Sequence, residues 1–186
     1  MMIQNKRIAM FATMGVLMAL ALVLEYVDKT FLSFAWLQGG SISTSAFIIF
    51  VVGWRYKAAA GALFAGVYGF LTFYLFGGTM YSLIQVVLEY GLAFIVLGVI
   101  AGLTPMGTSR WKLPYVIGGI WVACAIRLLI HTVAGIIFFA EYAPAGQAVW
   151  LYSLTYNGLY MVPNAILYTV LTVLLWPTLN RLAKSA

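Results

Sequence analysis

Charge is scarce in this sequence. Only 8% of its residues are charged, whereas 65% are hydrophobic, and ordinary globular domains carry roughly a quarter charged residues. A surface of this composition needs lipid, not water, as its main solvent. The shortage of charge therefore excludes a separate soluble domain and predicts an integral membrane protein.

Catalytic and metal-binding motifs are also missing. There is no G-x-x-x-x-G-K-[ST] phosphate loop, no H-E-x-x-H, no G-x-S-x-G and no Cys/His cluster with metal spacing. The lone Cys124 lies in an apolar run, so it predicts a small core residue and no internal disulfide. We expect no catalytic residue, no metal and no cofactor. An intramembrane hydrolase using Glu89 and His131 stays an alternative, although it lacks a nucleophile.

Long apolar runs fill most of the chain. They are centred on six windows, at 7–27, 41–54, 58–76, 80–104, 114–139 and 150–177. A membrane-spanning helix needs about 20 apolar residues, and the short loops leave no room for a second domain. We therefore predict an all-α membrane protein with six transmembrane helices in one domain, 1–186. The second window is short, so we expect a short or tilted helix after an irregular segment, 30–40.

The basic residues predict the orientation. Eight of them fall on one side of a six-span arrangement, namely Lys6, Arg7, Arg55, Lys57, Arg110, Lys112, Arg181 and Lys184. The opposite loops hold only Lys29, beside Asp28, and the acid Glu141. By the positive-inside rule both termini are cytoplasmic. Anionic lipid head groups of the bilayer explain the net charge of +6, and no nucleic acid is required.

Three polar residues occupy similar depths in three different windows. At 1.5 Å per residue, Glu89, His131 and Asn157 lie roughly 13, 12 and 10 Å from the outer ends of their helices. A charged group at mid-membrane costs about 2.5–3.5 kcal/mol on insertion scales, so such groups usually face a cavity. We predict a buried polar site in the outer half of the membrane. Arg127, one turn from His131 on the same face, is expected to pair with an acid or with carbonyl groups.

Aromatic side chains surround these three residues in the sequence. Tyr90, Phe139 and Tyr152 belong to the same windows, and Trp36 lies in the outer loop. A carboxylate among aromatic faces suits a flat organic cation or an amine-bearing heterocycle. Tyrosine and tryptophan at these depths are also typical of an ordinary interfacial belt.

The first window carries small residues on one face. Gly15 and Ala19 have small-xxx-small spacing, which lets another helix approach closely. The other helix is either a partner protein's or one from this chain.

Together these features resemble the thiamine-specific substrate-binding (S) component of energy-coupling factor transporters. The resemblance covers nearly the whole chain. It rests on the six spans with cytoplasmic ends and on these residues: Gly15 and Ala19, Trp36, Glu89-Tyr90 followed by Gly91-Leu92-Ala93-Phe94, Arg127 with His131, and Tyr152 ahead of Asn157-Gly158.

The resemblance implies a cell-membrane protein that captures thiamine from outside and performs no chemistry. A transmembrane coupling subunit and two cytoplasmic ATPase subunits would then complete uptake. Glu89 would pair with the charged thiazolium and pyrimidine side of thiamine, with His131, Tyr90, Tyr152 and Asn157 completing the pocket. By the same resemblance Trp36 would close the pocket, Gly135 would let the ligand approach the backbone, and Gly15 and Ala19 would meet the coupling subunit.

One pocket position departs from the family pattern. Phe139 stands where the family has a tryptophan that stacks on the ligand, so the ring can stack but donates no N–H. Two alternatives therefore stay open: an S component for another vitamin or a thiamine precursor, and a stand-alone secondary carrier. A carrier would need inverted repeats and interrupted helices, which this sequence does not display.

Overall fold

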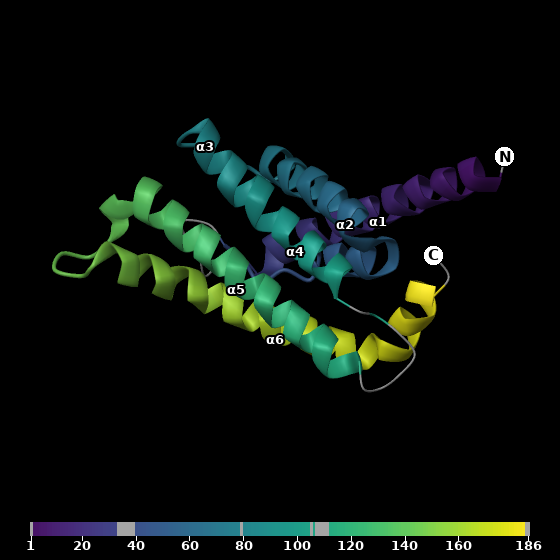
Figure 1. The fold of residues 1–186 in the computed structure, drawn as a ribbon. Helices are drawn as coiled ribbons and strands as arrows, with labels where there is room; N and C mark the ends of the chain where they lie inside the picture. The colour runs from purple at the N-terminus through teal and green to yellow at the C-terminus, as the bar shows by residue number, and fades with distance from the viewer. Residues whose placement is uncertain (1, 33–39, 79, 105, 107–111, 185–186) are drawn as a thin grey trace.

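The structure, a computed structural model, describes residues 2–32, 40–78, 80–104, 106 and 112–184, and these are helical apart from turns and connections (Figure 1). The elements in chain order are α1 (Met2–Leu32), α2 (Phe47–Leu75), α3 (Leu83–Val86), the π-helical turn η1 (Val87–Leu92), α4 (Ala93–Leu103), α5 (Leu113–Phe138), the 3-10 turn η3 (Ala140–Tyr142) and α6 (Val149–Lys184). The all-α class predicted from composition is confirmed.

Five helices in the described residues are long and apolar enough to cross a membrane: Lys6–Phe31, Phe47–Leu75, Leu83–Leu103, Leu113–Phe138 and Val149–Ala183. Four of the predicted windows each match one of these helices. The remaining two, 41–54 and 58–76, both fall largely within Phe47–Leu75. The predicted count of six spans therefore depends on whether α2 is one continuous helix or two.

α2 is interrupted at Lys57. This residue has φ 73° and ψ −179°, a backbone conformation that does not continue a helix. A Cβ placed on Gly61 would lie 3.0 Å from the Cα of Gly53, whereas eight residues of continuous helix rise about 12 Å. The chain therefore turns back on itself at Lys57, and 47–56 packs beside 58–75.

Glycines allow this hairpin to pack closely on α4. A Cβ on Gly53 would lie 2.6 Å from that of Ala101, and one on Gly61 would meet the carbonyl of Gly98. Backbones can approach this closely only where side chains are absent, which is how membrane helices commonly pack. α4 packs against α2 on one side and α5 on the other, and α6 runs alongside α5 (Figure 1).

α1 leans out from the bundle, and its first half projects beyond it (Figure 1). Of the α1 side chains whose burial is described, only Met14, Ala21, Glu25 and Asp28 are buried. The helix runs past the predicted end of the first window, so Asp28 and Lys29, which we expected in an outer loop, belong to α1. The continuing helix brings Glu25 and Asp28 into hydrogen bonds with Ser45.

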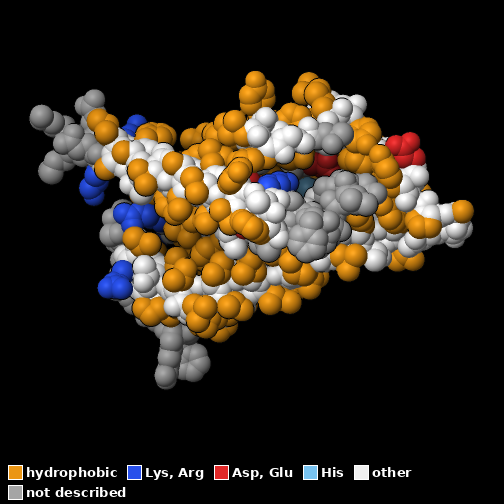
Figure 2. All heavy atoms as spheres, turned by 180° about the vertical axis from the view of Figure 1, so that it is seen from behind, with side chains coloured by type: hydrophobic (Ala, Val, Ile, Leu, Met, Phe, Trp, Pro, Cys, Tyr) orange, Lys and Arg blue, Asp and Glu red, His pale blue; other side chains and the backbone are white. Residues whose placement is uncertain are grey.

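Hydrophobic side chains cover the outside of the molecule (Figure 2). Tyr74 is 82% exposed and Leu174 71% exposed, which in water would be costly but in a bilayer places apolar surface against lipid tails. The interior contains an aromatic cluster in which the ring centroids of Phe50 and Tyr168 are 5.4 Å apart. Cys124 is buried, as the sequence predicts.

Candidate functional site

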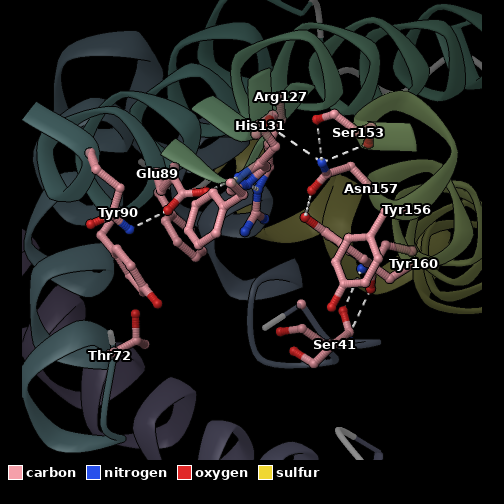
Figure 3. Close-up of a pocket in the computed structure, with 18 of the residues that line it drawn as sticks. Ser41, Thr72, Glu89, Tyr90, Arg127, His131, Ser153, Tyr156, Asn157 and Tyr160 are labelled. Atoms are coloured by element: carbon pink, nitrogen blue, oxygen red, sulfur yellow. Dashed lines mark hydrogen bonds and ion pairs between the residues drawn. The ribbon is translucent and has the colours of Figure 1, made fainter. Parts of the chain in front are cut away.

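A cavity of about 540 Å³ lies between α1, α2, η1, α5 and α6 and the segment 40–43 (Figure 3). This volume is within the range of small-molecule sites. Seven of the eight substrate-binding residues predicted from the sequence line it: Glu89, Tyr90, His131, Gly135, Phe139, Tyr152 and Asn157. The eighth, Trp36, lies outside the described residues. Glu89, His131 and Asn157, which residue counting placed at a similar depth, thus line one cavity.

Glu89 is carried by the π-helical turn η1. Ser82 caps the start of α3 by accepting a hydrogen bond from the Gln85 backbone N–H at 3.0 Å, and the buried Gln85 amide in turn donates to Oε2 of Glu89. π-helical turns are rare and frequent at functional sites, because the extra residue rotates side chains relative to the rest of the helix. Here the turn presents both Glu89 and Tyr90 to the cavity.

His131 reaches Glu89 from α5. Its Nδ1 lies 3.6 Å from Oε1 of Glu89, and its Nε2 accepts a hydrogen bond from Nε of Arg127 at 3.3 Å. We expected Arg127 to pair with an acid or a carbonyl group. Instead its guanidinium lies 4.0 Å over the ring of Phe94, a cation–π contact, because His131 stands between it and the carboxylate.

Asn157 joins α6 to α5. Its Nδ2 donates to the Ser153 carbonyl at 2.8 Å and to the His131 carbonyl at 3.5 Å, and its Oδ1 accepts from the Tyr160 hydroxyl. Both ends of the amide therefore have protein partners. Asn157 lines the cavity, but its bonds also hold the wall together (Figure 3).

Gly135 and Phe139 complete the α5 wall. A Cβ on Gly135 would collide with Oγ of Ser153, so helix packing itself requires glycine here. Phe139 ends α5, and its ring stands edge-on to Tyr81 with centroids 4.9 Å apart. The ring is thus held by another aromatic side chain at the cavity wall.

The predicted partner residues lie away from the cavity. Gly15 and Ala19 are exposed on α1, and nothing stands within 4 Å of a Cβ on Gly15. Of the two alternatives for this face, packing of Gly15 against this chain's own helices is not found among the residues that the structure describes.

A family model described as thiamine transporter protein (Thia_YuaJ) matches residues 11–184. The chain belongs to the thiamine transporter protein family. It is 30% identical to the thiamine transporter ThiT of Bacillus subtilis (strain 168) over 191 residues, covering 98% of this chain and 97% of that protein. It is 31% identical to ThiT of Lacticaseibacillus paracasei over 181 residues, covering 91% and 86% respectively.

The fold is also shared with a solved structure. ThiT from Listeria monocytogenes superposes with a TM-score of 0.77, covering 96% of this chain and 99% of that chain, at 22% identity. The family resemblance inferred from the sequence is therefore confirmed. This member of the thiamine transporter family is a multi-pass cell-membrane protein, and its family is one of transporters, not enzymes.

Sequence reasoning missed two buried acids in this family member. The sequence predicted a pocket with one acid, but Glu25 also lines the cavity and is 5% exposed. Asp28, 1% exposed, accepts from the Thr44 hydroxyl at 2.8 Å and from the Ser45 backbone N–H at 2.9 Å. The Ser/Thr-rich stretch before α2 could have indicated these acids. Non-helical backbone in a membrane needs polar partners, and Glu25 and Asp28 are the acids that supply them.

Asn164 of α6 supports the same stretch from the other side. Its Oδ1 accepts from the Ser43 backbone N–H at 2.8 Å, and its Nδ2 donates to the Ser41 carbonyl at 2.8 Å. The non-helical segment at 40–46 is thus fixed by α1 and α6 together. Gly40, Ser41 and Ser43 of this segment line the cavity.

Proposed function

We propose that this chain is the high-affinity thiamine-binding S component of an energy-coupling factor importer, which captures the vitamin from outside the cell. The observation that carries the proposal is the carboxylate of Glu89 within an aromatic-lined cavity, in a member of the thiamine transporter family. Thiamine is a permanent cation with an aminopyrimidine ring, and this pocket offers the Glu89 carboxylate together with aromatic faces.

Each residue of the pocket has a proposed role. Glu89 pairs with the thiazolium and pyrimidine side of the ligand, and the Phe139 ring stacks on it. The remaining pocket residues, Tyr90, His131, Gly135, Tyr152 and Asn157, supply hydrogen bonds and shape. Trp36 closes the pocket from the loop after α1. In this account Asn157 acts mainly as a support for His131, since its amide is bonded to protein groups.

The proposed topology has six membrane segments in a single domain, 1–186, with both termini in the cytoplasm. The reversal at Lys57 supports counting 47–56 and 58–75 as separate segments. Lys and Arg side chains gather at the end of the molecule where α1 begins (Figure 2), and the termini lie toward one end of the bundle (Figure 1). That distribution is what the positive-inside rule expects of a cytoplasmic end.

Uptake is proposed to need a transmembrane coupling subunit and two cytoplasmic ATPase subunits. The chain has no phosphate loop of its own. The exposed Gly15 and Ala19 give α1 a surface on which another membrane helix could pack closely. We assign this surface to the coupling subunit.

Titration of the purified protein tests the ligand assignment. Thiamine should quench the tryptophan fluorescence saturably at submicromolar concentration, whereas riboflavin and biotin should leave it unchanged. Quenching by riboflavin or biotin in place of thiamine would mean that the protein binds another vitamin. Absence of any response in correctly folded protein would contradict the proposal.

A further inference from the structure

Glu25 is a second carboxylate on the cavity wall. It comes from α1, across the cavity from α5 and α6, and is 5% exposed. A buried acid within a membrane segment is expensive and is usually retained for a function or for a dedicated set of partners. The hydrogen bonds of its two oxygens indicate which of these applies.

The two oxygens of Glu25 have very different surroundings. Oε2 accepts from the hydroxyls of Ser45 at 2.6 Å, Tyr68 at 2.8 Å and Ser43 at 3.4 Å. Oε1 faces Nζ of Lys29 at 4.0 Å, beyond hydrogen-bond distance. An ionised carboxylate offers about four acceptor sites. Oε2 thus anchors the side chain, and Oε1 keeps capacity for a donor.

Glu25 and Glu89 line the same cavity, and a series of side-chain contacts connects their surroundings. The Tyr68 hydroxyl donates to Glu25, and the Tyr68 ring meets Phe94 edge-on at 5.4 Å. The guanidinium of Arg127 lies over the Phe94 ring and donates to His131, the neighbour of Glu89. The two acids therefore have aromatic rings among their surroundings in one cavity, an arrangement that suits a ligand with a polar group for each acid.

Resting on the proposed thiamine binding, we propose that Oε1 of Glu25 accepts a hydrogen bond from the hydroxyl group of thiamine's hydroxyethyl side chain. Glu89 holds the cationic ring system, which leaves this hydroxyl as the donor at the far end of the ligand. Glu25 is then a specificity-determining residue that reads the end of the molecule where a phosphate is attached in other forms of the vitamin.

A cycle of two ligands and two proteins tests this contact. The ligands are thiamine and its deoxy analogue, in which ethyl replaces hydroxyethyl; the proteins are the unaltered chain and Glu25→Gln. A hydrogen bond to a charged group predicts that the unaltered protein binds the analogue about 10- to 100-fold more weakly than thiamine. Glu25→Gln should remove most of this difference, because the amide that replaces Oε1 donates instead of accepting.

Asp28→Asn is the matched control. Asp28 lies one turn along α1, anchors the same segment and is buried, but it is not on the cavity wall. It should weaken both ligands equally, so the discrimination between them survives. If Asp28→Asn removed the discrimination as fully as Glu25→Gln does, Glu25 would act only through the segment 40–46, and the proposal would be wrong.

The two proposals fail in different ways. If the unaltered protein binds neither ligand, thiamine binding itself is wrong. If it binds both equally tightly, thiamine binding stands and the Glu25 contact is overturned. This second comparison uses only the unaltered protein, so it remains decisive even where Glu25→Gln does not fold.

Discussion

Nδ1 of His131 lies 3.6 Å from Oε1 of Glu89, which links α5 to the π-helical turn across the cavity. The other ring nitrogen accepts from Arg127, so the hydrogen-bond pattern assigns the proton of a neutral ring to Nδ1, facing the carboxylate. The Gln85 amide donates to the other carboxylate oxygen, Oε2. Glu89 is therefore held between Gln85 of α3 and His131 of α5, with its carboxylate on the cavity wall.

The surface of α1 should matter for uptake and not for binding. Gly15→Leu or Ala19→Leu would fill the space that a partner helix needs, since both positions are exposed and far from the cavity. We expect unchanged thiamine affinity in purified protein and loss of thiamine uptake in cells that express the coupling module. Gly118→Leu, at another exposed helical glycine with nothing within 4 Å of a Cβ, should leave uptake intact. Normal uptake by both α1 variants would refute the assignment of this surface.

The reversal at Lys57 predicts which loops face the cytoplasm. In a chain with Cys124 replaced by alanine, a cysteine at position 57 should react with a membrane-impermeant thiol reagent only in inside-out vesicles. A cysteine at Gly77, an exposed position in the next connection, should react only in intact cells. Labelling of both from the same side would mean that 58–75 does not cross the membrane as a separate segment.

Close packing at Gly61 should be important for stability. A Cβ there would meet the Gly98 carbonyl, so Gly61→Ala should lower the free energy of unfolding by about 1–3 kcal/mol. Gly158→Ala is the comparison, because nothing lies within 4 Å of its Cβ and alanine favours helix by about 1 kcal/mol. Thermal unfolding in detergent measures both. Equal midpoints for the two variants would contradict the hairpin packing.

Counting residues from the helix ends was enough to predict that Glu89, His131 and Asn157 lie near one another. Depth in a membrane helix is nearly a linear function of residue number, because the rise per residue is fixed. Apolar length also located most helix ends to within a few residues. At α1 and α6 polar residues continue the helix beyond the apolar run, and the window 41–54 began six residues before α2 starts at Phe47. The substrate-binding roles of the cavity residues stay predictions.

Glu25 and the π-helical turn were beyond this reasoning for physical reasons. Glu25 was not singled out because its partners lie 18–43 residues away on a non-helical segment and on α2. The turn at Val87–Leu92 adds a residue to a helix; it contains no proline, and its single Gly91 does not mark a π-helical turn in advance. Such features depend on tertiary contacts that hydropathy does not contain.

The most direct test of the central claim is the thiamine affinity of Glu89→Gln, measured by calorimetry beside Glu141→Gln. Glu141 is an exposed acid in η3 outside the cavity lining, so its substitution should leave affinity unchanged. Loss of the partly buried carboxylate opposite a cation predicts a cost of about 2–5 kcal/mol, or about 30-fold to several thousandfold in affinity. Glu89 is partly buried, with its side chain 16% exposed, and an affinity for Glu89→Gln equal to that of the unaltered protein would contradict the account.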